Sequence, residues 1–220
     1  MAAFERYLEL IIEGNRRANL TVIVDPAQIR LRHFLDSLTI AAAIEPDRIS
    51  RSRVLDVGSG AGLPGVALAI ALPGCRVTLL EATGKKASFL EHVRSDLALC
   101  DLAVIRDRAE TAAHIPGVRE SFDIVVSRGV ARLSTLVELT MPFCRIGGLF
   151  VGYKGREAEA ELDAAARALD ATGAGEPAVV RVDTAIIGEG RDARLVVVPK
   201  CAPSPERFPR REGVPGRRPL

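Results

Sequence analysis

Four glycines follow an aspartate within a few residues in the stretch Val54-Leu-Asp-Val-Gly-Ser-Gly-Ala-Gly-Leu-Pro-Gly65. The apolar run at 53–57 is short and partly β-branched, which is typical of a buried parallel strand. Glycines permit a sharp turn and let the backbone approach a ligand without a Cβ between them. Pro64 suits the first turn of a helix, whose unpaired N–H groups favour an anionic or strongly polar ligand. The stretch therefore predicts a strand, a ligand-binding loop and a helix. An ordinary turn would need fewer glycines.

Two acids flank this loop. Asp56 stands two residues before Gly58, where its carboxylate would reach polar parts of a methionine moiety directly or through water. Glu81 ends a second predicted strand and lies 21 residues beyond Gly60. In βαβ nucleotide-binding units, an acid at about this distance accepts hydrogen bonds from ribose hydroxyls. The alternative for Glu81 is a surface acid near the start of the next helix.

The segment Gly60-Ala-Gly-Leu-Pro-Gly65 also matches G-x-G-x-x-G, the fingerprint of nicotinamide and flavin dehydrogenases. A chain of 220 residues leaves no obvious second domain to carry a hydride acceptor. With Asp56 before it and Glu81 after it, the loop has the pattern of Rossmann-like methyltransferases. We therefore expect S-adenosyl-L-methionine as the cofactor.

Periodicity and turn residues place these motifs in an alternating chain. An amphipathic helix is predicted at 3–13, ended by Gly14, and a second at 27–43. The alternation that follows predicts a doubly wound α/β fold, with a mostly parallel seven-stranded sheet and helices on both faces. Together with the pattern of the glycine loop, this is the class I methyltransferase fold. The expected strands are 53–57, 76–81, 102–105, 122–127, 149–153, 178–187 and 194–199, and the expected helices are 64–72, 83–97, 133–141 and 156–170. We expect a helical extension at 1–47, a cofactor-binding domain at 48–200 and a basic tail at 201–220.

Charge and cysteine content limit the class of protein. The net charge is only +2, yet residues 200–220 hold six Lys or Arg against two Glu. Such a basic segment often contacts phosphate, and a solvated, disordered end is the alternative. The four cysteines lack a C-x-x-C pair, so neither a disulfide framework nor a zinc site is indicated. Because the apolar runs are short as well, we expect a cytoplasmic monomer without metal or membrane contact.

A polar cluster occurs on the second predicted helix, where His33, Asp36 and Ser37 are spaced to share one face. They would line the mouth of a site, or His33 and Asp36 would simply pair at the surface.

The residues after the fourth strand bear on the methyl acceptor. Exocyclic amine methylation commonly uses an Asn/Asp/Ser-Pro-Pro-aromatic loop there, whereas this chain has Ser127-Arg-Gly-Val130. Cytosine C5 methylation needs a nucleophilic cysteine, and none follows this strand closely. A ring nitrogen such as guanine N7 has a free lone pair and no proton to lose. Placement in line with the methyl group then suffices without a general base.

Taken together, the motifs resemble the glucose-inhibited division protein B family of bacterial small-subunit ribosomal RNA guanine-N7 methyltransferases. The match runs in order from about residue 15 to the C-terminus. The matching segments are Asn19-Leu-Thr21, Arg32–Ser37, Leu55–Gly65, Gly84-Lys-Lys86, Arg108-Ala-Glu110, Phe122–Arg128, Lys154-Gly155 and Arg207–Pro215.

This resemblance implies methylation of N7 of a guanine in the 530 loop of 16S ribosomal RNA, within the 30S subunit or an assembly intermediate. It assigns cofactor contacts, beside Asp56 and Gly60 of the loop, to Gly58, Leu63, Glu81, Ala109, Glu110 and Arg128. It also implies that the reaction site is lined or supported by His33, Asp36, Ser37, Arg128 and Lys154. RNA phosphates would be contacted by Arg207, Arg210 and Arg211.

The chain departs from the family pattern at three points. The N-terminal helical region is shorter than usual, Gly14 stands where many relatives have a tryptophan, and Gly129 replaces a usual alanine. Two other functions remain open at this stage: a small-molecule methyltransferase of the same fold, and a nucleotide-binding regulatory protein without catalysis.

Overall fold

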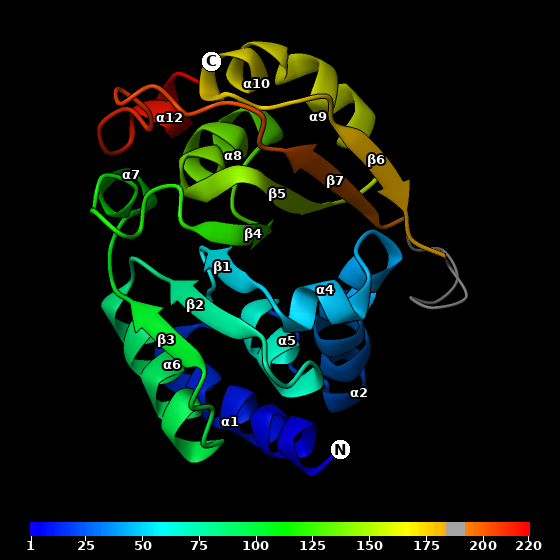
Figure 1. Ribbon diagram of the computed structural model, residues 1–220. Helices are drawn as coiled ribbons and strands as arrows, with labels where there is room; N and C mark the ends of the chain where they lie inside the picture. Colours follow the sequence, from blue (N-terminus) through cyan, green and yellow to red (C-terminus); the bar gives the residue numbers. More distant parts are fainter. Residues whose placement is uncertain (184–191) are drawn as a thin grey trace.

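The strands form one mixed sheet in the order β3-β2-β1-β4-β5-β7-β6 (Figure 1). The computed structural model describes residues 1–183 and 192–220. Five strands are parallel: β1 (Arg53–Val57), β2 (Arg76–Leu80), β3 (Leu102–Ile105), β4 (Phe122–Arg128) and β5 (Cys144–Lys154). Antiparallel pairing adds β7 (Arg194–Pro199) and β6 (Ala178–Arg181). The predicted class I methyltransferase fold is confirmed.

Several element boundaries differ from the predicted ones. Strand β5 begins at Cys144, five residues earlier than expected. The single helix expected at 156–170 is divided into α9 (Ala158–Ala164) and α10 (Ala166–Thr172). Strand β6 ends at Arg181, and part of its predicted extension to 187 lies outside the described residues.

Helices cover both faces of the sheet (Figure 1). One layer holds α1 (Ala2–Ala18), α5 (Gly65–Ala71) and α6 (Gly84–Asp96), and the other holds α8 (Leu133–Thr140), α9 and α10. Successive side chains of a strand point to opposite faces, so Val54 packs into the first core and Leu55 into the second. The short helices α7 (Ala109–Ala112) and α12 (Val214–Arg217) lie beside the second layer.

The first helix continues past Gly14, so the prediction that Gly14 ends it is wrong. Helix α1 runs to Ala18 and is followed by Asn19 in the left-handed conformation, with φ of 48°. A Cβ atom at Gly14 would lie 2.6 Å from ring carbons of Phe89. The glycine therefore marks a close approach of α1 to α6, a long-range contact that local helix-ending rules do not register.

The second helical stretch agrees with its predicted range to within a residue. It begins at α2 (Pro26–Ile29) and continues without a break through η1 (Arg30–Leu35), α3 (Asp36–Leu38) and η2 (Thr39–Ala42). The Asp25 carboxylate caps its start by accepting the Gln28 N–H at 2.8 Å. An additional short helix, α4 (Pro46–Ser50), precedes β1. Within the described ranges, no helix combines the length and apolar character that spanning a bilayer requires.

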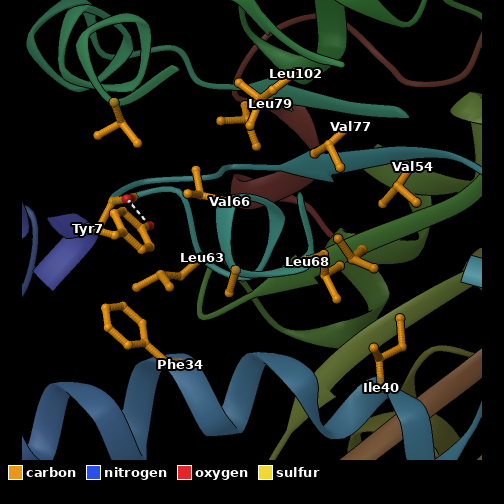
Figure 2. Packing of buried hydrophobic residues seen from close by; sticks show 14 of the residues in the cluster. Tyr7, Phe34, Ile40, Val54, Leu63, Val66, Leu68, Val77, Leu79 and Leu102 are labelled. Atoms are coloured by element: carbon orange, nitrogen blue, oxygen red, sulfur yellow. Dashed lines mark hydrogen bonds between the residues drawn. The ribbon is translucent and has the colours of Figure 1, made fainter. Parts of the chain in front are cut away.

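Tyr7 of α1 supports the glycine loop from below. Its hydroxyl donates a hydrogen bond of 2.7 Å to the carbonyl oxygen of Ala61, and the side chain is fully buried. The ring stacks on Phe34, with centroids 5.1 Å apart, and lies near Leu63 and Val66 (Figure 2). A Cβ at Gly62 would approach the Tyr7 hydroxyl to 2.8 Å. The N-terminal helix is thus part of the support of the loop.

We predict that Tyr7→Phe lowers the free energy of unfolding by about 1–3 kcal/mol, because the Ala61 carbonyl loses its buried donor while the ring packing is kept. Urea denaturation of both proteins measures the loss. Tyr7→Ala, which also removes the ring, should cost about 3–5 kcal/mol. A Tyr7→Phe protein as stable as the unaltered chain would show that this hydrogen bond does not hold the loop.

Candidate active site

The glycine loop is hydrogen-bonded to the last residue of β2. The backbone N–H groups of Gly58 and Ser59 donate to the carbonyl oxygen of Leu80 at 2.9 and 3.2 Å. Gly62 has φ of 95°, a left-handed conformation that favours glycine. A side chain at Gly65 would overlap both Leu79 and Asp56, so its absence lets α5 begin directly against the sheet. Glycine is required here for shape as well as for access.

Asp56 lies beneath the loop with no exposed surface. Its Oδ2 accepts the Gly65 N–H at 2.9 Å, whereas Oδ1 has no hydrogen-bond partner among the described residues. Burial raises the pKa of this carboxyl to about 7, against the lowering effects of the Gly65 N–H and the Arg128 charge. A buried acceptor without a donor is costly. The orphaned oxygen therefore fits a donor that the described chain does not supply, such as an ammonium group.

Glu81 ties the second strand to the loop. Its Oε2 accepts the Gly60 N–H at 2.9 Å and its Oε1 accepts the Thr83 N–H at 2.7 Å. The side chain is largely buried at the carboxyl end of β2, so it is not the exposed surface acid considered as the alternative. Each carboxylate oxygen can accept a second hydrogen bond. The ribose contact stays a prediction.

A cavity of about 220 Å³ opens above the loop. It brings together five of the residues predicted from the sequence, namely His33, Gly58, Gly60, Leu63 and Arg128. The remaining lining residues were not predicted as site residues: Leu20, Thr21, Ser59, Ala61, Lys86, Gly129 and Val130. We call this hollow the loop cavity.

A second cavity, of about 310 Å³, lies beyond the ends of β4 and β5. It is lined by Asp36, Thr39, Arg128, Gly129, Ala131, Tyr153, Lys154, Gly155, Asp192, Ala193, Arg194 and Leu195. We call it the acceptor cavity. Arg128 and Gly129 line both cavities, so they form the wall between them.

Arg128 is fixed in this wall by an ion pair with Asp36. The guanidinium Nη1 lies 2.8 Å from Asp36 Oδ2, and it also donates to the carbonyl oxygen of His33 at 3.3 Å. The two charged side chains are 15% and 14% exposed, so the pair is largely shielded from water. The helix of His33 and Asp36 is thereby joined to the end of β4.

The other polar residues of that helix have supporting contacts. His33 Nε2 lies 2.7 Å from the Thr21 hydroxyl, at the rim of the loop cavity. Ser37 is fully buried, donates to the His33 carbonyl at 2.5 Å, and accepts the Tyr153 hydroxyl on its own carbonyl at 2.6 Å. Ser37 therefore supports the wall of the site from behind rather than lining it.

Lys154 shapes the loop that follows β4. Its Nζ donates to the Ala131 carbonyl at 2.8 Å and pairs with Glu161 Oε2 at 2.6 Å. The same oxygen of Glu161 accepts the Leu133 N–H at 2.7 Å. Lys154 and Glu161 together hold residues 131–133 in place at one side of the acceptor cavity.

Ala109 and Glu110 line neither cavity. They lie at the start of α7, beyond the end of β3, which is where a parallel sheet places adenine-contacting groups. Glu110 Oε1 accepts the N–H of Gly213 from the C-terminal tail at 2.9 Å. The carboxylate therefore already joins two parts of the chain, and its cofactor contact stays a prediction.

The basic tail packs against α7 and α8 rather than forming a solvated end (Figure 1). Arg210 binds the fully buried Glu138 of α8 through its Nε at 2.8 Å and its Nη2 at 2.7 Å. Arg207 lies over the ring of Phe208, and Arg211 is exposed. RNA contacts for these three arginines stay predictions, but the charge of Arg210 is already balanced inside the protein.

Sequence reasoning missed Glu138 and Tyr7, which act through long-range contacts. A signal for Glu138 does exist, since it is the single charged residue within α8, a helix that is otherwise uncharged and buried. An acid in such a helix is almost never fully buried unless it is paired. Nothing in the sequence indicates which cation would pair with it.

Comparison with known proteins adds the family context. A family model described as rRNA small subunit methyltransferase G matches residues 1–186. Proteins called ribosomal RNA small subunit methyltransferase G from Chloroflexus aggregans and Roseiflexus castenholzii are 45% and 42% identical, covering 100% and 99% of this chain and 90% of each relative. Among solved structures, an O-methyltransferase from Bacillus cereus in complex with SAH is similar in fold, with a TM-score of 0.60, 21% identity and coverage of 89% of this chain and 91% of that one.

We predict that Asp56 makes the stability of the protein depend on pH. In the unfolded chain its pKa is about 4, and in the folded protein it is about 7. Between these values the folded state holds the additional proton, so the free energy of unfolding falls as pH rises, by at most ~1.4 kcal/mol per pH unit. Well above pH 7 both states are ionised and this contribution stops changing.

Urea denaturation between pH 5 and pH 8 tests this expectation. In Asp56→Asn the free energy of unfolding should fall less steeply with rising pH. In Asp47→Asn, at a side chain that is 92% exposed, it should fall as in the unaltered chain. Parallel slopes for Asp56→Asn and the unaltered chain would contradict a raised pKa at Asp56.

A second prediction concerns the tail. Arg210→Ala leaves the Glu138 carboxylate buried without its cation, which should cost about 3–5 kcal/mol of folding free energy. The exposed Arg207→Ala should change it by about 0.5 kcal/mol or less. Thermal and urea denaturation measure both. Adding Glu138→Gln to Arg210→Ala should recover stability, because the unpaired charge is then gone; no recovery would argue against the pair.

Proposed function

The chain belongs to the rRNA small subunit methyltransferase G family, and from that membership we propose that it methylates N7 of a guanine in the 530 loop of 16S ribosomal RNA. The observation that carries the proposal is the pair of cavities that meet at Arg128 and Gly129. Methyl transfer needs a donor and an acceptor held in line and in contact. Two hollows that adjoin at the same two residues provide neighbouring places for both.

The proposed cofactor is S-adenosyl-L-methionine, which supplies an electrophilic methyl group. The loop cavity would hold its methionine part. Asp56 lies beneath the loop and does not line this cavity, so its orphaned Oδ1 would accept from the ammonium group through a water molecule. Glu81 would accept ribose hydroxyls. Ala109 and Glu110, placed beyond β3, would contact the adenine.

Arg128 would orient the acceptor base. After its bond to Asp36 the guanidinium still has N–H donors, since arginine carries five. Guanine presents O6 as an acceptor beside N7 in the same edge. A hydrogen bond from Arg128 to O6 alone would fix the base and leave the N7 lone pair free to attack.

The remaining residues of the site act on position rather than on protons. N7 has no proton to lose, so correct placement can supply the rate enhancement. Asp36 fixes Arg128 through their ion pair, and Lys154 fixes the carbonyl of Ala131. The hydroxyl of Tyr153, the residue before Lys154, binds the carbonyl of Ser37, the residue after Asp36, and so connects these two contacts. The wall between the cavities is therefore held from both sides.

The test uses 30S subunits isolated from a strain that lacks this gene. Incubated with the protein and radiolabelled S-adenosyl-L-methionine, they should accept label in a nucleoside that comigrates with 7-methylguanosine. Arg128→Ala should lower kcat at least tenfold, because the base is no longer oriented. Arg167→Ala, at an exposed residue of α10, should leave it unchanged.

Other outcomes distinguish the remaining alternatives. Label in an exocyclic amine or on ribose would refute N7 as the acceptor atom. Cofactor binding by calorimetry without transfer to 30S subunits would favour a small-molecule methyltransferase or a regulatory protein of the same fold. Tight binding of NAD with no response to S-adenosyl-L-methionine would exclude methyl transfer altogether.

A further inference from the structure

A groove of about 650 Å³ separates the C-terminal half of α1 from α6. It is lined by Gly14, Arg17, Ala18, Lys85, Ser88, Phe89 and His92. We call it the α1–α6 groove. Its volume lies within the range of about 300–1,000 Å³ that is usual for ligand sites.

The groove adjoins the loop cavity through two consecutive lysines. Lys85 lines the groove, and Lys86 lines the loop cavity together with Arg128 and Gly129. Arg128 and Gly129 in turn line the acceptor cavity. The three hollows therefore follow one another across the protein, with the first turn of α6 between the groove and the loop cavity.

The cations along this path are not balanced within the fold. Arg17 and Lys85 are exposed and Lys86 is half-buried, and in the described part of the chain none of the three forms an ion pair or hydrogen bond through its side chain. Arg106 lies beside the first residue of α6, where its Nη2 would come within 2.6 Å of a Cβ built on Gly84, but it lines none of the three hollows. Positive charges gathered without counter-charges create a potential that attracts polyanions.

The tail offers less free charge than its composition indicates, although its exposed Arg211, Arg217 and Arg218 form no ion pair among the described residues. Arg210 is paired with Glu138. The guanidinium of Arg119, beside the tail, donates to backbone carbonyls of Ala113, Ser204, Pro205 and Phe208. The N–H donors of Arg119 thus join the tail to the rest of the domain.

We infer that the α1–α6 groove binds the phosphate backbone of the ribosomal RNA strand whose guanine enters the acceptor cavity. The inference rests on the proposed function for the identity of the polyanion. Arg17 and Lys85 contact phosphates at the rim. The floor, made by Gly14, Ala18 and Phe89, carries no charge and gives the sugar edge of the strand an apolar surface.

The experiment compares the unaltered chain with the double variant Arg17→Ala/Lys85→Ala. A matched control, Arg76→Ala/Arg167→Ala, removes two exposed cations that line none of the three hollows and form no ion pair in the described residues. Equilibrium binding of labelled protein to 30S subunits, from the strain lacking the gene, is measured between about 50 and 200 mM salt, where phosphate contacts change affinity strongly. Calorimetry with S-adenosyl-L-methionine and thermal denaturation are run in parallel.

Each phosphate contact contributes about 0.7–0.9 to the slope of log affinity against log salt concentration. The groove variant should therefore lose about 1.5 from this slope and bind 30S subunits at least tenfold more weakly at the lower salt concentrations. Its cofactor affinity and melting temperature should not change. The charge-preserving variant Arg17→Lys/Lys85→Arg should keep the original slope.

A groove variant with the same slope and affinity as the control would overturn the inference. A failure of the proposed function looks different. In that case the unaltered chain binds the subunit with the expected salt dependence, yet transfers no methyl group to N7.

Discussion

The shape of the glycine loop is fixed by hydrogen bonds from three different elements, and the loop cavity depends on it. Tyr7 donates to the Ala61 carbonyl from below, Asp56 accepts the N–H at the start of α5, and Glu81 accepts the N–H of Gly60. Each of these groups comes from a different element. A loop held in this way can present its backbone to a ligand without rearranging, which reduces the ordering cost of binding. The N-terminal helix is for this reason part of the site, although it lines neither cavity.

Arg128, in the wall between the cavities, is likewise held in place by contacts from other elements. An ion pair that is largely removed from water is costly unless both charges are well placed. The pair of Arg128 with Asp36 meets that condition, because the guanidinium also donates to the His33 carbonyl. Behind the wall, the Tyr153 hydroxyl binds the Ser37 carbonyl and joins the same helix to β5. The side chain of Arg128, which lines both cavities, is thus held by a helix that is itself joined to β5.

The sequence was sufficient to predict elements whose signals are local. The strands β1, β3 and β7 match their predicted limits, because short apolar runs define them. The loop residues Gly58, Gly60 and Leu63 come together as expected. The prediction that Gly14 ends the first helix was wrong, because the glycine leaves room for the ring of Phe89, which is 75 positions away in the sequence. Contacts of that kind depend on the packing of whole helices, and spacing along the chain does not contain them.

Charge composition was the least reliable guide, because it counts cations without regard to their partners. In the tail, Lys200 is almost fully buried, lies 3.1 Å from Glu120, and has its pKa lowered by that burial. Arg210 is paired with a buried carboxylate on α8. These cations fasten the last twenty residues to the domain, and a charge neutralised inside the protein has little field left for a polyanion outside. The cations that keep their field are those without partners among the described residues, which include Arg17, Lys85 and Lys86 at the junction of α1 and α6 as well as Arg211, Arg217 and Arg218 of the tail. The ion pairs that the fold has already made therefore reduce the charge that the tail can offer to a nucleic acid.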